Sequence, residues 1–326
     1  MHKDNFDTKS VVEAGLISSL IVVIMLITIY VPLFAIVGTF ILPIPVTVLY
    51  LRHNAKITLA AVVVSAVLIA MLYNPISALT TSMLFGATGL TLGYCIKNEK
   101  KVWITLVMLA VVSAVATMID FSIYITFISK EGFAGFINQN LQIMKESINA
   151  ASKMGMSKAQ LEQLNQTYAI FTPEFIAEMI PAMLLVGGFT SAYINYNMTR
   201  GILRRFKYDI EPVPPFSTLY ISNRIGTVIL IVVIAGTLMS RGNIYLGKYI
   251  LISSQLILEM VLLIEGISLA AYGLRNKLKM NKLFTVLIIL ITASTAATSM
   301  MFVFAGLMDM IVDFRKLDPF RRKKAQ

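Results

Sequence analysis

Long apolar runs, separated by short polar segments, dominate the pattern of this chain. Each run has the length that a membrane-crossing helix needs, about 20 residues. The runs predict membrane helices at 11–30, 33–51, 57–73, 76–96, 103–129, from 172 onward, at 219–239 and at 249–274. Val31-Pro32 and Asn74-Pro75 mark two of the tight turns between them. The pattern therefore predicts an all-α polytopic transmembrane bundle.

Residues 283–314 form a last, nearly uncharged stretch that allows two interpretations. It is either one tilted helix or a hairpin broken in the small and hydroxyl-bearing run 292–299. Hairpin arms of about 15 residues would be about 22 Å long, which is shorter than the hydrocarbon core of about 30 Å. The charge distribution favours the hairpin. The bundle is expected to contain nine or ten membrane-embedded helices.

The polar segment 130–171 has a different period. Apolar residues recur every three or four positions from Ile137 to Ala151, which predicts an amphipathic helix. Ser157 and Gln160 have the spacing of a capping box that opens a second short helix. We expect a helical hairpin on the membrane surface. The predicted parts are an N-terminal five-helix block at 1–129, this extracytoplasmic segment at 130–171 and a C-terminal block with basic cytoplasmic loops and tail at 172–326.

Composition and charge placement support a membrane protein. The chain is 57% hydrophobic and 14% charged, whereas soluble domains contain about 25% charged residues. The net charge of +11 comes from short basic loops between apolar runs, without the basic face and interleaved aromatics of a nucleic-acid site, so nucleic acid is not an expected partner.

The basic residues also predict the orientation. With a cytoplasmic N-terminus and alternating crossings, the loops 52–56, 97–101, 199–224 and 275–282 and the tail all face the cytoplasm. All but six of the 28 Lys and Arg residues then lie on that side, as the positive-inside rule requires. The tail is cytoplasmic only if 283–314 turns back as a hairpin.

Several classes of chemistry are excluded by residue content. Cys95 is the single cysteine, and His2 and His53 are the only histidines. No His-Glu-x-x-His, Gly-x-Ser-x-Gly or phosphate-loop motif is present. We therefore expect no enzymatic activity, no metal and no cofactor.

Ionisable groups inside apolar runs are the candidates for function, because they are costly in a bilayer unless they are paired or hydrated. The candidates for a polar cavity are Glu259, Glu265, Asp120 and Asn74. Glu259 is the most central in its run, and Glu265 lies about 240° around the same helix. The alternative for each carboxylate is structural pairing in the interior. The basic candidates for cytoplasmic or lipid contact are Arg200, Arg204, Arg205 and Arg315.

Small residues four apart on a membrane helix allow a second helix to approach closely. The first run carries two such pairs, formed by Ala14, Gly15, Ser18 and Ser19. We interpret them as a candidate helix-docking face, with ordinary packing inside the bundle as the alternative. A Gly89-x-x-x-Gly93 pair in the fourth run predicts another closely packed face.

A set of stretches, taken in order, resembles the YybS-like family of bacterial membrane proteins, which has no assigned biochemical function. The matching residues are Leu42-Pro43-Ile44-Pro45, Pro181, Asn195-Tyr196, Arg200, Arg204-Arg205, Pro212-Val213-Pro214-Pro215-Phe216, Gly306-Leu307-Met308-Asp309 and Asp313-Phe314-Arg315. The resemblance implies a location in the bacterial plasma membrane. The front half is also similar to the S components of energy-coupling-factor vitamin transporters, whose first helix carries an Ala-x-x-x-Ala docking face where this chain has Ala14 and Ser18. The chain is longer than such a six-helix component and carries no vitamin-specific motif.

Two functions are consistent with these features. The first is binding of a small solute, of unknown identity, for uptake in the manner of an S component, with an energy-coupling membrane subunit as partner. The second is a non-transporting scaffold or regulator that acts on another membrane protein through its cytoplasmic loops and helix contacts. Uptake predicts an internal polar cavity near 130–171. A scaffold predicts tightly packed helices without such a cavity and an exposed face of small or apolar residues.

Overall fold

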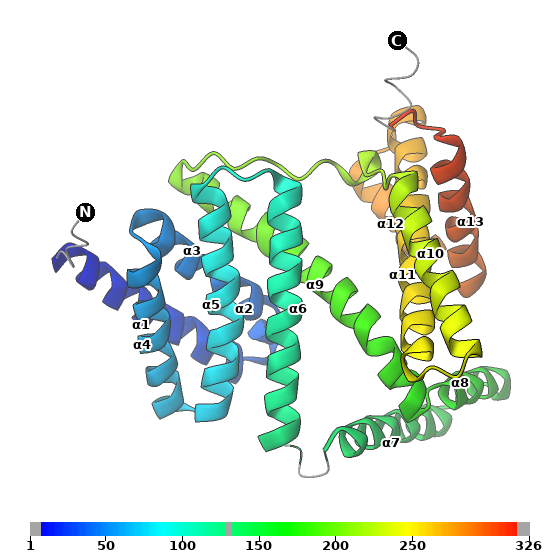
Figure 1. The fold of residues 1–326 in the computed structure, drawn as a ribbon, viewed down its shortest axis with the longest axis horizontal. Helices are drawn as coiled ribbons and strands as arrows, with labels where there is room; N and C mark the ends of the chain where they lie inside the picture. The colour runs from blue at the N-terminus through cyan, green and yellow to red at the C-terminus, as the bar shows by residue number, and fades with distance from the viewer. Residues whose placement is uncertain (1–7, 128, 130–131, 318–326) are drawn as a thin grey trace. The chain divides into compact units, whose positions relative to one another are not determined.

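The computed structural model describes residues 8–127, 129 and 132–317 of the chain. Every regular element in this part of the chain is a helix, and two compact units can be distinguished (Figure 1). The N-terminal unit comprises Met1–Pro173 and Leu184–Val213, and the C-terminal unit comprises Glu174–Met183 and Pro214–Gln326. The helix α9, Pro173–Leu203, therefore contributes residues to both units.

The N-terminal unit contains five membrane-length segments ahead of α9. They are α1 (Thr8–Tyr30), a broken crossing made of η1 (Pro32–Phe34), α2 (Ala35–Ile41) and α3 (Pro43–Arg52), then α4 (Ala55–Leu72), α5 (Pro75–Lys97) and α6 (Val102–Phe127). The break at Leu42 follows from Pro43, which occupies the first position of α3 and has no N–H for a continuing helix. Pro43 thus interrupts the second crossing.

Close contacts between α3 and α5 hold the middle of this unit together. A Cβ on Gly89 would overlap Val46, and one on Gly93 would overlap Tyr50. The Thr47 hydroxyl donates to the carbonyl of Gly89 over 3.1 Å. The Gly-x-x-x-Gly pair is therefore a packing face, as predicted, and it brings two helix backbones together at the centre of the unit.

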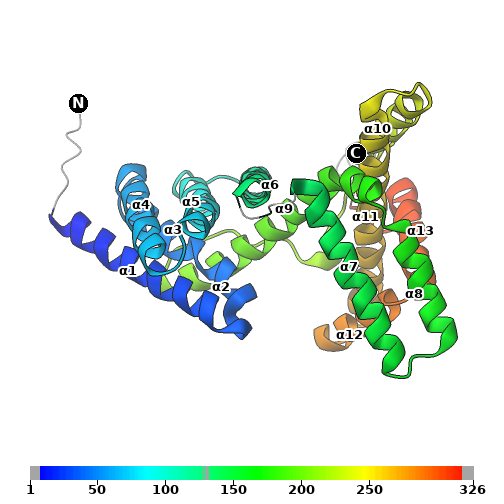
Figure 2. The same cartoon turned by 90° about the horizontal axis from the view of Figure 1, so that it is seen from below.

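An amphipathic hairpin follows α6. It consists of α7, Gly132–Lys153, and α8, Lys158–Ile170, which lie side by side in Figure 2. The apolar face of α7 buries Ile137 and Ile148. The Ser157 hydroxyl accepts from the N–H of Gln160, whose side chain accepts from the N–H of Ser157, so the predicted capping box is present.

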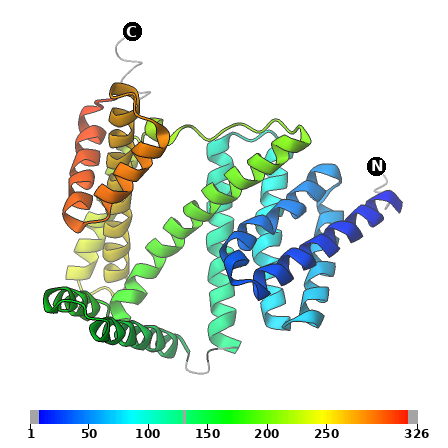
Figure 3. The ribbon, with the colours of Figure 1, turned by 180° about the vertical axis from the view of Figure 1, so that it is seen from behind.

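The C-terminal unit is built around α11. Its elements after α9 are η3 (Phe216–Thr218), α10 (Asn223–Arg241), α11 (Tyr245–Tyr272), η4 (Gly273–Lys277), α12 (Lys282–Ala293) and α13 (Ala296–Val312). Both α10 and α13 pack along α11, while α12 runs at an angle to them (Figure 3).

Eight helices of the described chain are long and apolar enough to cross a membrane. The pair α12 and α13 passes the same test only jointly, with a bend of 111° between Lys282–Ala293 and Thr298–Val312. The stretch 283–314 is therefore two helices broken inside the predicted run 292–299, not one tilted helix. The chain is an all-α polytopic membrane protein.

Candidate functional site

The four residues predicted to line a polar cavity have different environments. Asn74 caps α5, because its side-chain oxygen accepts from the N–H groups of Ile76 and Ser77. Asp120 is half-buried on α6 of the N-terminal unit, and Glu259 is exposed on α11 of the C-terminal unit. The fourth, Glu265, is fully buried.

Glu265 belongs to a charged cluster, defined here as Glu265 on α11, Asp309 on α13 and Arg315 just after α13. All three side chains are 0% exposed. Nε of Arg315 donates to Oδ2 of Asp309 over 2.8 Å, and Nη2 donates to Oε1 of Glu265 and forms an ion pair with Oδ2 of Asp309 at 2.7 Å. The remaining nitrogen, Nη1, donates to the Ser268 hydroxyl over 2.7 Å and to the Leu219 carbonyl over 2.9 Å. All three nitrogen atoms of the guanidinium therefore donate hydrogen bonds.

The charged cluster fixes the segment that precedes α10. The Ser268 hydroxyl contacts the carbonyls of Phe216 and Leu219 over 2.7 and 2.8 Å. The second carboxyl oxygen of Glu265, Oε2, accepts from the N–H of Ile221 over 2.9 Å. The backbone of 216–221 is thus held by hydrogen bonds from α11 and from Arg315.

The end of α13 explains how Arg315 reaches the interior. Asp313 follows the last helical residue in the left-handed conformation, with φ of 55°, a region that Asp tolerates better than most residues. Its Oδ1 accepts from the N–H of Leu317 over 2.8 Å. The chain therefore reverses at Asp313, and the Arg315 side chain returns to Asp309 on the helix that has just ended.

Two glycines allow α11 and α13 to approach closely. A Cβ on Gly266 would overlap the carbonyl of Phe302, and a Cβ on Gly306 would overlap the carbonyl of Leu262. Gly266 directly follows Glu265, and Gly306 lies almost one turn before Asp309. The close crossing therefore places the two carboxylates where one guanidinium can bind both.

The prediction of a surface contact is wrong for Arg315, because its side chain is enclosed by the charged cluster. Arg204 and Arg205 are exposed, in the short helix η2 (Arg204–Phe206). Arg200 is half-buried, and its Nε donates to the carbonyl of Ile210 over 2.9 Å. Arg200 therefore stabilises the segment after α9.

A shallow apolar groove runs between α1 and α4 in the N-terminal unit. Its volume is about 230 Å³. Its lining residues are Val11, Ala14, Gly15, Ser18, Ile57, Ala60, Ala61 and Val64. The buried Ser18 hydroxyl donates to the carbonyl of Ala61 over 3.0 Å, which closes the groove at its base. Gly15 has no atom within 4 Å of an added Cβ, so its side of the groove is open. Ser19 is exposed, and its hydroxyl donates to the Gly15 carbonyl of the same helix over 3.0 Å.

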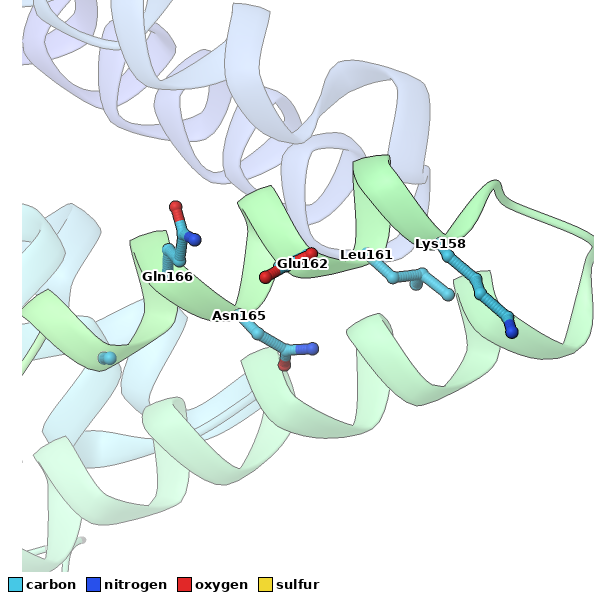
Figure 4. A pocket seen from close by; sticks show the side chains of 6 residues that line it. Lys158, Leu161, Glu162, Asn165 and Gln166 are labelled. Atoms are coloured by element: carbon cyan, nitrogen blue, oxygen red, sulfur yellow. The ribbon is translucent and has the colours of Figure 1, made fainter.

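Two polar hollows also occur in the N-terminal unit. One of about 410 Å³ lies between the α5–α6 turn and the segment after α9, where the Tyr196 hydroxyl donates to the Glu211 carbonyl over 2.7 Å. Glu99, Lys100 and Asp209 line it. The other is an open hollow along α8, where the side chains of Lys158 and its neighbours come from that helix alone (Figure 4).

Comparison with known proteins places the chain in a family. The model of the family described as "Predicted membrane protein (DUF2232)" matches residues 19–310. The chain belongs to this family. It is similar to "Uncharacterized protein YybS" of Bacillus subtilis (strain 168), with 23% identity over 277 residues that cover 83% of this chain and 86% of that protein. No solved structure matches the chain.

The matched range covers only part of the charged cluster and only part of the groove between α1 and α4. It contains Glu265 and Asp309 and ends before Arg315, and it begins after Ala14 and Gly15. Sequence reasoning named Glu265 and Arg315 but did not connect them. A carboxylate in an apolar run needs a cationic partner, and that rule was the signal that could have suggested Arg315.

Proposed function

We propose that this protein is a membrane subunit that docks a transmembrane helix of a partner protein in the groove between α1 and α4. The open Gly15 side of that groove is the observation that carries the proposal. Lipid tails are as apolar as a helix surface, so helices associate in a bilayer through close van der Waals contact. A groove of small residues permits such contact.

The expected occupant is an apolar helix with a small residue at the contact point. The lining offers methyl groups and short side chains, with the Ser18 hydroxyl already engaged. A charged or strongly polar segment would lose hydration there without gaining a partner. In this form the protein is the scaffold or regulator of the second sequence hypothesis, and its exposed Arg204 and Arg205 are available to the partner or to anionic lipid.

Solute uptake in the manner of an S component is the second candidate. It is favoured by the arrangement of the N-terminal unit, which has five membrane-length segments and most of the α9 helix as a sixth. In that function the same groove on α1 docks an energy-coupling membrane subunit. The two candidates share the docking face and differ in the identity of the partner.

The proposal is tested by photo-crosslinking in intact membranes. A small amino acid that carries a diazirine is placed at position 15. The control carries it at position 16, which lies about 140° around the helix from the groove residue Val11 and is 67% exposed. We expect a discrete protein adduct from position 15 and none from position 16. A Gly15→Leu change, made with the diazirine moved to position 14, should fill the groove without disturbing the fold and abolish the adduct.

The identity of the adduct separates the two functions. An energy-coupling transmembrane subunit, recovered with its ATPases, would support uptake. A different membrane protein crosslinked through a transmembrane segment would support the scaffold. Adducts with lipid alone, or adducts that survive Gly15→Leu, would contradict docking in this groove.

A further inference from the structure

The charged cluster carries an excess of negative charge if all of its members are ionised. It contains two carboxylates, Glu265 and Asp309, and one guanidinium, Arg315, all 0% exposed. A buried charge without a counter-charge is strongly unfavourable, and such groups commonly become neutral instead. The composition of the cluster therefore points to one additional positive charge.

The hydrogen bonds show where that charge would bind. Both oxygens of Glu265 accept from N–H groups, Oε1 from Arg315 and Oε2 from Ile221. Oδ2 of Asp309 accepts from Nε of Arg315 and lies 2.7 Å from Nη2. The other oxygen, Oδ1 of Asp309, is buried and has no hydrogen-bond partner among the described residues. Nη2 of Arg315 lies against both Oε1 of Glu265 and Oδ2 of Asp309, so the two carboxyl groups adjoin each other.

The neighbouring charged and titratable groups of the described chain do not hydrogen-bond to Oδ1 of Asp309. On the elements that pack around the cluster these groups include Tyr220, Arg224, Asp313 and Lys316, each of which takes part in an interaction. Arg275 and Lys277, in η4 after α11, are exposed.

We propose that the charged cluster is a proton-binding site, in which one proton is held by the adjoining carboxyl groups of Asp309 and Glu265. The proton makes the cluster neutral. It also removes the electrostatic repulsion between the two carboxylates. This matters for the segment 216–221, which is held by hydrogen bonds from Arg315 and Ser268 and by the bond from Ile221 to Glu265. The occupancy of this site therefore controls how firmly that segment is attached to α11.

The two carboxylates respond differently to substitution. In Asp309→Asn the amide oxygen can replace Oδ2, and the amide NH₂ takes the position of Oδ1, the oxygen that has no hydrogen-bond partner among the described residues. In Glu265→Gln the NH₂ group must face an N–H donor, either of Arg315 or of Ile221, because both Glu265 oxygens are acceptors. We expect Asp309→Asn to preserve the folded unit and Glu265→Gln to weaken it.

Infrared spectroscopy of the full-length protein in lipid vesicles at neutral pH tests the site directly. Glu259 is exposed along a membrane helix and could give a similar signal, so the measurements use the Glu259→Gln variant as the parent. We expect the parent to show the carbonyl band of a protonated carboxylic acid. Adding Asp309→Asn should remove the band while the thermal unfolding midpoint is retained, and adding Glu265→Gln should also remove it.

Two results would overturn the proposal. One is a parent spectrum without a carboxylic acid band, and the other is a band that persists after both Asp309→Asn and Glu265→Gln. A parent that lacks the band and is stabilised by sodium relative to choline at fixed pH would identify a metal cation in place of the proton. If Asp309→Asn unfolds the protein, the band of the folded parent still decides between these outcomes.

Discussion

At Arg315, a single side chain provides hydrogen bonds to three parts of the C-terminal unit: α11, α13 and the segment 216–221. Arg315→Ala would remove the donor to Oδ2 of Asp309 and to Oε1 of Glu265 and leave two buried carboxylates without a cation in the cluster. Removing one partner of a buried ion pair typically costs about 3–5 kcal/mol. We expect a loss of this size in the stability of the C-terminal unit, measured as a lower thermal unfolding midpoint in detergent.

Matched variants distinguish this effect from a general loss of charge. Arg315→Lys keeps the charge but loses the planar fork that binds two carboxylates at once, so it should restore only part of the stability. Arg204→Ala removes an exposed arginine and should change the stability by no more than about 0.5 kcal/mol. A wild-type midpoint in Arg315→Ala would show that the charged cluster does not stabilise the unit.

The position of a carboxylate within an apolar run did not indicate its environment. Glu259 is the more central, yet it is exposed, whereas Glu265 is fully buried. The partners of Glu265 are 44 and 50 residues away along the chain, so no local pattern relates them. The identity of the candidates could be predicted from their chemistry, and their pairing required the tertiary structure.

Between elements, the contact of α11 with α13 depends on Gly306. An added methyl group there would overlap the Leu262 carbonyl, and a backbone atom cannot move aside as a side-chain end can. Overpacking a well-packed interior costs about 1–3 kcal/mol. We expect Gly306→Ala to lower the unfolding midpoint accordingly and, because it separates the carboxylates, to increase hydrogen exchange at Ile221.

The control for Gly306 is the same substitution at Gly15, where nothing lies within 4 Å of an added Cβ. Because alanine is favoured over glycine inside a helix by about 1 kcal/mol, Gly15→Ala should leave the midpoint unchanged or raise it. Equal destabilisation by both substitutions would mean that close packing is not the cause of the Gly306 effect.

Helices were the most predictable level of the structure, for physical reasons. Apolar length identified the membrane helices, the 3–4 period identified α7, and the Ser157–Gln160 spacing identified the start of α8. Each of these signals is contained within one segment of chain. The partners of the glycine faces were not predictable, because Gly89 and Gly306 show where a helix can approach but not which helix does so.

At the scale of the whole molecule, the compact units do not follow simple stretches of chain, since α9 contributes residues to both. A hydrophobicity pattern gives the order and length of crossings, and it contains no information on which crossings form a common core. The segment after α9 illustrates this. Its residues Ile210 and Glu211 form hydrogen bonds with α9 in the N-terminal unit. Leu219 and Ile221, a few residues later, form hydrogen bonds with the charged cluster of the C-terminal unit.

The arrangement of loops within each unit makes the membrane orientation testable. In the N-terminal unit, Lys97 at the end of α5 donates to the His53 carbonyl after α3 over 2.6 Å, so these two basic loops lie on one side. The positive-inside rule assigns that side to the cytoplasm. Single cysteines, introduced after Cys95→Ala, should then be labelled by a membrane-impermeant maleimide from outside at Met154, which is 88% exposed, and only after permeabilisation at Lys100.

The same assay determines the topology of α12 and α13. Their bend of 111° is compatible with a pair that enters and leaves the membrane on one side, an arrangement that would return the basic tail to the cytoplasm. We therefore expect a cysteine added after Gln326 to be labelled, like that at Lys100, only in permeabilised cells. Labelling of this cysteine from outside, while a cysteine at Lys100 stays unlabelled, would show that α12 and α13 together form a single crossing and that the tail lies outside.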